Sequence, residues 1–280
     1  MNNIHMTLNL TIAIPTFNEE IHLASCIEAI GKGFAKEVFI IDSNSTDKTK
    51  QIADELDVKV INFTWDGKYP KKRNWFIQNH YLKTEWILFL DADEKITKKF
   101  KKETERILLN TKHSGFYLSY SNHFLNKKLK GGVKFKKLAL FRINSGEYER
   151  IDENNWSNLD MEVHEHPILK GSVGQIKAEI NHMDFKGMSR YIEKHNQYSS
   201  WEAERYLNLK NKKNFYKDLT FRQKFKYSLL GTPFYSIGFF LLQYFFLGGW
   251  KDGKVGLTFA LLKAGYYIQV YSKIYEKIQK

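Results

Sequence analysis

The sequence predicts an α/β protein: a Rossmann-like, mostly parallel sheet with flanking helices, followed by an apolar C-terminal helical hairpin. Over the first hundred residues, strand-like apolar runs alternate with segments of helical spacing. These runs are continuously apolar, as expected of strands that helices cover on both faces. The last sixty residues contain two long apolar and aromatic stretches. Alternating strands and helices favour a parallel sheet, and the two final stretches favour a separate helical appendage.

The expected elements follow from these patterns in chain order. The first half has predicted strands at Leu8–Pro15, Glu37–Asp42, Val58–Phe63 and Trp86–Leu90. Its predicted helices cover Glu19–Lys32, the stretch "STDKTKQIADEL" with Ser45 or Thr46 as N-cap, and Lys95–Leu109. The second half has predicted strands at Gly115–Ser121, Lys137–Ile143 and Val173–Ile180, and a helix at Ser189–Leu209.

Charge and cysteine content limit the compartment and the partners. The formal net charge of +13 indicates an anionic partner: nucleic acid, an anionic membrane surface or a phosphorylated substrate. The single cysteine, Cys26, excludes an intrachain disulfide and fits a reducing compartment. Cys26 shares a helical face with Leu23 and Ile30, so we expect a buried core residue rather than a nucleophile. The N-terminal residues lack the features of a secretory signal, which predicts a cytoplasmic protein.

The C-terminal stretches Leu229–Trp250 and Val255–Tyr275 raise the question of a membrane. A spanning helix needs about 20 apolar residues, and glycine and proline interrupt the first stretch. Aromatic residues with flanking lysines favour a hairpin that lies on an anionic membrane surface. The alternative is a helical pair that packs on the main domain. The basic loop Lys127–Lys137 is either a solvated surface or a contact with anionic lipid or a phosphorylated acceptor.

Acidic residues follow three neighbouring strands of the predicted sheet. "PTFNEE" follows the first strand, "DSNSTDKT" the second and "DADE" the fourth. Open α/β sheets bind ligands at these strand ends, and clustered carboxylates repel one another unless a cation lies between them. Oxygen ligands indicate Mg²⁺ or Mn²⁺. A single Asp at a strand end would be a turn or cap, but three such ends with Lys71, Lys72 and Arg73 nearby predict a nucleotide-diphosphate site. "PTFNEE" lacks the glycines of a dinucleotide site.

Four motifs in order, "IAIPTFNEE", "VFIIDSNSTDKT", "KKRNW" and "WILFLDADE", resemble the family-two inverting glycosyltransferases with the GT-A fold. The later "VHEHPILKG" and "GGWKDGKVGLTFALLKAGYY" resemble a bacterial branch that adds sugars, often glucose, to the lipopolysaccharide inner core or related surface glycans. The resemblance implies a glycosyltransferase domain over residues 1–215, with a nucleotide-sugar half (1–110) and an acceptor half (111–215). Residues 216–280 would form a membrane-associating helical region.

The resemblance also implies roles for individual residues. Asp93 would bind the metal, and Asp91 would contact the ribose, the metal or a metal-bound water. The remaining nucleotide-sugar contacts would come from Pro15, Thr16, Asn18, Glu19, Asp42, Ser45, Asp47, Arg73, Asn74 and Ala92. The stretch "KKRNW" departs from the alanine-rich pattern of the family, which leaves the phosphate contacts open.

An inverting transfer needs a base that takes the proton of the acceptor hydroxyl, and the family supplies a carboxylate downstream of the metal motif. Within "DMEVHEH" we favour Glu165, with Glu162 second. The nearby His164 and His166, together with His182, suggest zinc as an alternative, but the spacing H-x-H does not match a helical zinc pair. One of these histidines could instead approach the metal or the diphosphate, or simply pair with neighbouring carboxylates.

These observations predict a metal-dependent hexosyltransferase, with glucose favoured. It would transfer the sugar from a UDP-sugar to a lipopolysaccharide-core, capsular or lipid-linked glycan at the inner face of the cytoplasmic membrane. The alternative enzyme is a sugar-phosphate nucleotidyltransferase, which usually has a glycine-rich basic signature after the first strand. A nucleic-acid partner is not expected, because the acidic strand ends would repel phosphate and no nucleic-acid-binding motif is present.

Overall fold

A computed structural model describes residues 7–150, 166–210, 219 and 221–279. The chain divides into two compact units. The sheet unit comprises residues 1–122 and 134–184, and the helical unit comprises residues 123–133 and 185–280.

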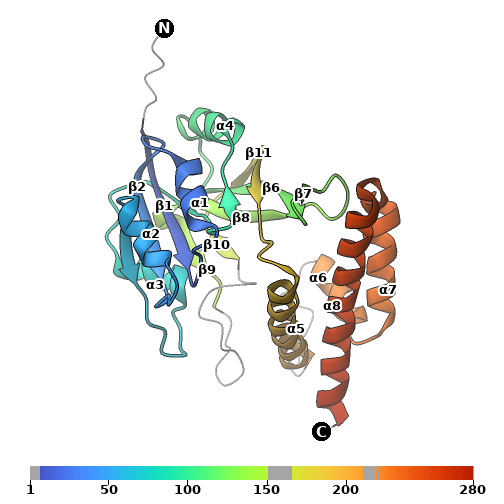
Figure 1. Ribbon diagram of the computed structural model, residues 1–280. Helices are drawn as coiled ribbons and strands as arrows, with labels where there is room; N and C mark the ends of the chain where they lie inside the picture. Colours follow the sequence, from blue (N-terminus) through green and yellow to red (C-terminus); the bar gives the residue numbers. More distant parts are fainter. Residues whose placement is uncertain (1–6, 151–165, 211–218, 220, 280) are drawn as a thin grey trace. The chain divides into compact units, whose positions relative to one another are not determined.

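The sheet unit is built on one mixed sheet with the strand order β3-β2-β1-β4-β8-β6-β11-β5 (Figure 1). Its first four strands are β1 (Leu8–Thr16), β2 (Ala35–Asp42), β3 (Lys59–Asn62) and β4 (Trp86–Phe89). The later strands are β5 (Glu94–Lys95), β6 (Gly115–Phe124), β8 (Lys136–Arg142) and β11 (Val173–His182). Strands β1 to β4 are mutually parallel, whereas β8 runs antiparallel to both β4 and β6. The predicted α/β class is confirmed.

Apolar side chains cover both faces of β1, which explains its uninterrupted hydrophobic sequence. Ile12 and Ile14 pack in a core with Cys26 and Phe100, beneath α1 (Leu23–Ile30), α2 (Thr49–Glu55) and α4 (Lys98–Leu108). Ala13 belongs to a second core on the opposite face, which contains residues of α3 (Lys72–Asn79) and β9 (Gly146–Tyr148). Cys26 is fully buried, as predicted. A central strand held in this way fixes the position of the segments at its carboxyl end.

Three predicted helix starts are wrong. The helix predicted from Lys95 begins at Lys98, because Glu94 and Lys95 form β5, which pairs with β11, and Thr97 caps the helix. The first helix begins at Leu23, because residues 19–22 form a turn. The second begins at Thr49 with Lys48 in the cap position, so neither Ser45 nor Thr46 caps it. Ser45 instead donates its hydroxyl to the Asp42 carboxylate, and a side chain bonded there is not available to the helix. The sequence pattern suits a cap, but the buried carboxylate competes for the same hydroxyl.

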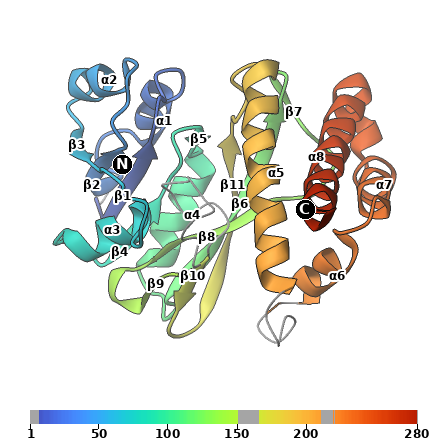
Figure 2. The same cartoon turned by 90° about the horizontal axis from the view of Figure 1, so that it is seen from below.

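The helical unit contains α5 (Met188–Lys210), α6 (Phe221–Leu229), α7 (Phe234–Leu241) and α8 (Gly253–Gln279). A π-helical turn, η2 (Leu242–Phe246), and a 3₁₀ turn, η3 (Gly249–Asp252), join α7 to α8. Helix α8 packs against both α5 and α7 (Figures 1 and 2), which confirms the predicted C-terminal helical pair. Among the helices within the described residues, none combines the length and hydropathy needed to cross a bilayer.

The compact units do not divide where the sequence suggested a boundary. Helix α5, assigned from sequence to the acceptor half, clusters with the C-terminal helices. Residues 123–133 do so as well, because the Asp252 carboxylate accepts hydrogen bonds from the backbone N–H groups of Lys130 and Gly131. The chain therefore divides after residue 184 rather than at 215. The assignment of donor, acceptor and membrane roles to the three sequence segments stays a prediction.

Candidate active site

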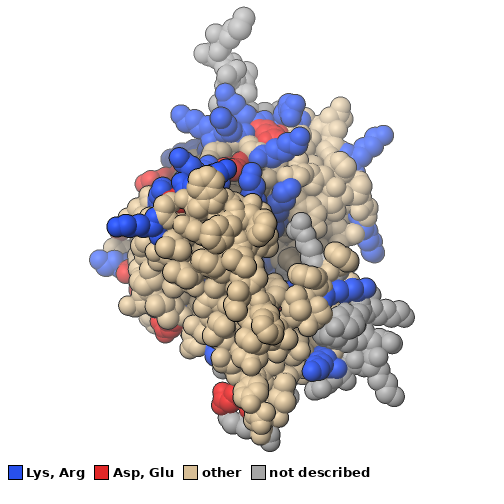
Figure 3. Space-filling model, turned by 90° about the vertical axis from the view of Figure 1, so that its right-hand side faces the viewer, with Lys and Arg blue, Asp and Glu red and all other residues tan. Residues whose placement is uncertain are grey.

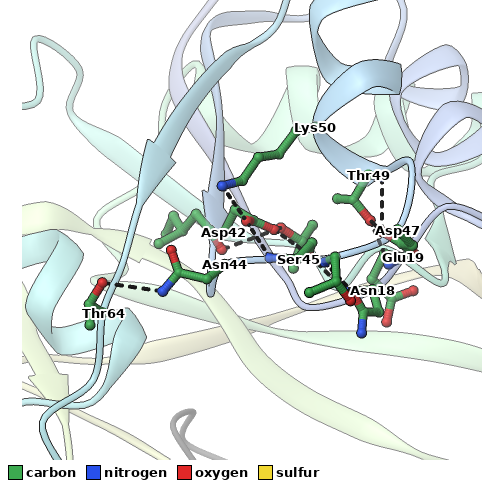
Figure 4. Close-up of polar contacts among 12 residues, drawn as sticks. Asn18, Glu19, Asp42, Asn44, Ser45, Asp47, Thr49, Lys50 and Thr64 are labelled. Carbon is green, nitrogen blue, oxygen red and sulfur yellow. Dashed lines mark hydrogen bonds and ion pairs between the residues drawn. The ribbon is translucent and has the colours of Figure 1, made fainter.

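The buried Asp42 carboxylate organises the segments that follow β1 and β2. Asp42 ends β2 opposite Thr16 of β1, and it is fully buried. Its Oδ1 accepts a 2.9 Å hydrogen bond from the Thr16 hydroxyl, and its Oδ2 accepts a 2.8 Å bond from the Ser45 backbone N–H. The ammonium group of Lys50 lies 3.6 Å from Oδ2 (Figure 4). The polar neighbours compensate the cost of burying this charge.

Side chains also tie the two segments directly to each other (Figure 4). The Asn18 backbone N–H donates to the Ser45 hydroxyl at 2.8 Å, and the Asn18 side-chain oxygen accepts from the Thr46 N–H at 2.9 Å. Asn18 has a φ of 55°, a left-handed conformation that asparagine tolerates better than most residues. The Glu19 N–H donates to the Thr49 hydroxyl at 2.8 Å. The predicted donor-site residues therefore form one connected structure.

The second part of the site surrounds Asp91, directly after β4. Arg73 of α3 donates to Asp91 Oδ1 at 2.7 Å, and Lys137 of β8 donates to Oδ2 at 2.6 Å. Lys137 Nζ also lies 3.3 Å from Glu94 Oε1, while Glu94 Oε2 accepts from the Asp91 backbone N–H at 3.1 Å. One cluster thus joins Asp91 and Glu94 to Arg73 and Lys137, and Lys137 contacts both carboxyl groups.

These contacts shift the pKa values of the Asp91 and Glu94 carboxyl groups in opposite directions. Burial would raise the pKa of Asp91, but Lys137 and Arg73 outweigh it and hold that pKa below its usual range. Burial raises the pKa of Glu94 to about 8, with Lys137 opposing and Asp91 and Asp93 adding to the rise. Burial lowers the pKa of Lys137, but Asp91 and Glu94 outweigh it and raise that pKa above its usual range. Asp91 is therefore the ionised partner of two cations, and Glu94 is the carboxyl that takes up a proton most readily.

A third group of side chains lies next to Asp91. One ligand atom each from Asp93, His182 and Asp184 lies within 4.8 Å of the others. Strand pairing brings them together: His182 at the end of β11 is paired with Glu94 of β5, and the Met183 N–H donates to the Asp93 carbonyl at 2.8 Å. His182 Nε2 is 3.7 Å from Asp93 Oδ1. The pairing of β5 with β11 therefore adds ligands to the "DAD" motif.

This group fits a divalent cation. Ligand atoms at about 2.1 Å on opposite sides of an octahedral ion are about 4.2 Å apart, so a small contraction would let all three bind one ion. Two carboxylates with an imidazole suit Mn²⁺ and are acceptable to Mg²⁺. Asp93, the predicted metal ligand, belongs to the group. Asp91 has both oxygens bonded to Arg73 and Lys137, so its predicted part in metal binding stays a prediction.

In the "KKRN" stretch at the start of α3, Lys72 and Asn74 bond backbone groups of neighbouring strands, and Arg73 bonds a carboxylate. Lys72 is buried and donates to the Thr16 carbonyl at 3.0 Å. Asn74 is fully buried, donates to the Tyr148 carbonyl and accepts from the Tyr148 N–H, each at 2.9 Å. Arg73 bonds Asp91. The observed bonds of Asn74 hold β9, and its contact with a nucleotide stays a prediction.

The structure brings most of the predicted site residues to one edge of the sheet. Pro15, Thr16 and Ala92 are buried in the strand ends, and Asp47 accepts a bond from the Glu20 N–H at 3.1 Å. Glu165 and Glu162, the two candidate bases, lie outside the described residues, as does His164.

Sequence reasoning missed two charged residues and only partly identified a third. Lys137 was placed in a basic loop, and Asp184 was not considered. His182 was one of three histidines left open, and it is the one that joins the acidic group. Lys137 lies in β8, His182 ends β11 and Asp184 follows β11. Their place in the site could be predicted only by knowing that β8 pairs with β6 and that β11 pairs with β5.

Comparison with known proteins agrees with this geometry. The model of the family described as "Glycosyl transferase family 2" matches residues 11–171. An uncharacterized glycosyltransferase of Rickettsia bellii is 35% identical over 115 residues, which make up 41% of this chain and 37% of that protein. The SPbeta prophage-derived glycosyltransferase SunS of Bacillus subtilis is 28% identical over 143 residues, or 46% of this chain and 33% of that protein. The chain thus matches well under half the length of these curated relatives.

Solved structures show more distant likeness. TarS of S. aureus is 19% identical, with a TM-score of 0.42 over 93% of this chain and 49% of that one. Glucosyl-3-phosphoglycerate synthase from Mycobacterium tuberculosis, in complex with Mn²⁺, UDP and glucosyl-3-phosphoglycerate, is 13% identical. Its TM-score is 0.41 over 69% of this chain and 78% of that one.

Proposed function

The chain belongs to glycosyl transferase family 2, and from that premise we propose that it is a metal-dependent inverting hexosyltransferase that uses a UDP-sugar. The family match favours this function over a sugar-phosphate nucleotidyltransferase. One observation supports the donor and metal parts of the proposal most strongly. The candidate cation site formed by Asp93, His182 and Asp184 lies beside Asp91, which bonds Arg73 and Lys137.

The charges of these two groups match the ends of a nucleotide diphosphate bound to a cation. Arg73 and Lys137 carry two positive charges against the single charge of Asp91, so this side of the site keeps a positive excess that suits phosphate oxygens. Asp93 and Asp184 attract a cation instead. A bound divalent ion would neutralise charge that develops on the departing diphosphate. Asp42 and the connected segments after β1 and β2 would hold the uracil and ribose.

The residues of the chain would divide the chemistry as follows. Asp91, fixed by Arg73 and Lys137, would position the ribose next to the metal ligands. Arg73 and Lys137 would stabilise negative charge on the leaving UDP through preorganised donors, which need no rearrangement when the sugar bond breaks. Glu165, or Glu162 in its place, would take the proton of the attacking acceptor hydroxyl. Attack opposite the leaving group inverts the anomeric carbon.

We propose glucose as the sugar and a lipopolysaccharide-core, capsular or lipid-linked glycan as the acceptor. The enzyme would act at the inner face of the cytoplasmic membrane, where such acceptors are built. The motifs "VHEHPILKG" and "GGWKDGKVGLTFALLKAGYY" support this assignment. The curated relatives add no support for this sugar or acceptor, since the matches cover only 37% and 33% of their lengths.

Purified full-length chain can be tested with a panel of UDP-sugars, Mn²⁺ or Mg²⁺, and a bacterial glycolipid extract. We expect UDP release that requires the metal and rises with acceptor, and a β-linked product from an α-linked donor by NMR. Release of pyrophosphate from a nucleoside triphosphate and a sugar phosphate would instead indicate a nucleotidyltransferase. A product with the anomeric configuration of the donor would contradict the inverting mechanism.

A further inference from the structure

The helical unit reverses the usual arrangement of polar and apolar side chains along α7 and η2. Residues 234–250 include no charged residue. The exposed large side chains Phe234, Ile237, Leu241 and Phe245 recur every three or four positions, and the exposed Leu242 and Phe246 follow directly after the last two, so these side chains lie toward one side of the turns. Phe234, Phe245 and Phe246 are 72%, 55% and 81% exposed. In a water-soluble helix this side would be polar.

The side of α7 and η2 that faces the rest of the helical unit carries the polar groups. Ser236 is 3% exposed and donates to the Ala264 carbonyl of α8 at 2.7 Å. Gln243 is also 3% exposed, and its side-chain oxygen accepts the Val133 N–H at 3.0 Å. These bonds satisfy the buried polar groups and fix the segment with its phenylalanines outward. The apolar exposure is therefore set by packing within the unit and does not come from a loose end of the chain.

The outward side chains belong to a larger uncharged surface. Trp250 of η3 and Leu257 and Leu261 of α8 are also exposed. Figure 3 shows the side of the molecule on which α7 and α8 lie, with a broad area free of Lys, Arg, Asp and Glu. We call the exposed apolar side chains of residues 234–261 the apolar face. Contiguous exposed apolar surface of this kind marks a binding surface for a protein or a membrane.

The charge of the helical unit favours an anionic membrane over a protein as the partner of the apolar face. By sequence, the helical unit holds 20 Lys and Arg against six Asp and Glu, whereas the sheet unit holds 24 against 25. The net charge is thus +14 and −1, so the helical unit accounts for the whole positive excess. Between residues 219 and 275 the only acidic residue in the sequence is Asp252. It is 2% exposed and bonded to backbone N–H groups, so its charge is not presented at the surface.

Lysines adjoin the apolar face at its η3 end. Lys251 and Lys254 are exposed, and Lys251 Nζ lies 5.6 Å from the centre of the Trp250 ring. An indole beside a lysine suits the headgroup region of a bilayer, where the ring lies among the glycerol groups and the ammonium reaches phosphate.

We propose that the apolar face inserts into the surface of an anionic bilayer, with α7 and η2 lying in the plane of the membrane. Phe245, Phe246 and Trp250 would reach the boundary between headgroups and acyl chains, about 5–10 Å deep. The flanking lysines would contact anionic headgroups and add to the affinity. The inference specifies the membrane partner of the proposed function, but it rests on the helical unit alone.

Flotation of the full-length chain with vesicles tests the proposal. Vesicles of phosphatidylcholine with phosphatidylglycerol should carry the wild-type chain upward, and vesicles of phosphatidylcholine alone should bind it about tenfold more weakly. The double variant Phe245→Ser/Phe246→Ser should lose about 100-fold in partition coefficient, since each buried phenylalanine contributes about tenfold or more. Tyr81→Ser, at a 90% exposed aromatic of the sheet unit, should float like the wild type.

The proposal is overturned if the wild type stays with the soluble fraction, or if the double variant floats as well as the wild type. It is also overturned if light scattering shows a dimer that the double variant dissociates, without flotation of either chain, since the apolar face would then join two copies. Flotation needs neither donor nor acceptor. A chain that floats but releases no UDP therefore contradicts the proposed function and leaves this inference standing.

Discussion

The sheet unit and the helical unit depart from ordinary packing in opposite ways at the surfaces for which a function is proposed. In the sheet unit the apolar residues of the central strands are inside, and the exception is a set of buried and partly buried charges at the strand ends around Asp91 and Asp93. In the helical unit the exception is outside, where phenylalanines of α7 and η2 are exposed while Ser236 and Gln243 are buried. Both arrangements reduce stability and persist because neighbouring groups hold them in place.

The comparison teaches that the two surfaces need different tests. Buried charges near a reacting diphosphate should affect turnover when they are changed, and those that are paired should affect stability as well. Exposed apolar side chains should affect membrane binding with little effect on stability. The following variants are arranged from the largest expected effect to the smallest.

Asp93→Ala should reduce turnover most. Loss of a carboxylate ligand removes a cation worth several kcal/mol to the transition state, which corresponds to about 10⁴-fold in kcat/KM. UDP release with donor, acceptor and Mn²⁺ measures it. The matched control is Asp54→Ala, an exposed aspartate on α2, which should retain wild-type turnover. Full activity in Asp93→Ala would show that the acidic group does not bind the catalytic metal.

Glu165→Gln should lower kcat by about 10³-fold, since a positioned general base contributes about 10²–10⁴-fold. Glu162→Gln, three residues away, serves as its comparison and should keep most of the activity. Donor binding should be unchanged in both variants, because neither is assigned to the nucleotide. The reverse result, with Glu162→Gln inactive and Glu165→Gln active, would move the base to Glu162.

Lys137→Met should destabilise the sheet unit by about 1–3 kcal/mol, because the buried Glu94 and the partly buried Asp91 would each lose a charged hydrogen-bond partner. Arg73 would still bond Asp91. Urea unfolding measures the change. Lys136→Met, at an exposed neighbour bonded to Gln175, should stay within about 0.5 kcal/mol of the wild type. Equal stability of the two variants would mean that the pair contributes nothing to folding.

Gln243→Leu and Phe246→Ser test whether α7 and η2 are held with polar side chains inward and apolar side chains outward. The first variant removes the oxygen that accepts the Val133 N–H, and this part-buried hydrogen bond should contribute about 0.5–1.5 kcal/mol to the free energy of unfolding. The second removes an exposed ring and should change that free energy by less than about 0.5 kcal/mol. Both are measured by urea unfolding without vesicles. A larger loss of stability in Phe246→Ser would show that its ring packs against protein in solution.

The sequence predicted the sheet well and the site in part, for physical reasons that particular residues illustrate. Strands such as β1 and β4 are buried on both faces, so their apolar runs are legible without tertiary information. The acidic residues after β4 suggest a cation, but Asp93 is predicted as the metal ligand through the family resemblance of its motif. Lys137 and Asp184 were missed because β8 and β11 reach the site through pairing between segments far apart in the chain.

The same limitation explains the errors in local structure and in the units. Ser45 looks like a helix cap in sequence, but a buried carboxylate three residues earlier binds its hydroxyl. Residues 123–133 belong to the helical unit because Asp252, more than a hundred positions later, bonds their backbone. The apolar C-terminal stretches are predicted from sequence to be helical, which the structure confirms, but only the structure shows which side of α7 faces outward.

Calorimetric titration of UDP into the chain, with and without Mn²⁺, tests the central claim that the acidic group of the sheet unit holds a cation for a nucleotide diphosphate. We expect Mn²⁺ to tighten UDP binding at least tenfold in the wild type and in Asp54→Asn. The same metal should have no effect in Asp93→Asn. If UDP binds the wild type and Asp93→Asn equally well, with or without Mn²⁺, then Asp93, His182 and Asp184 do not form the proposed metal site.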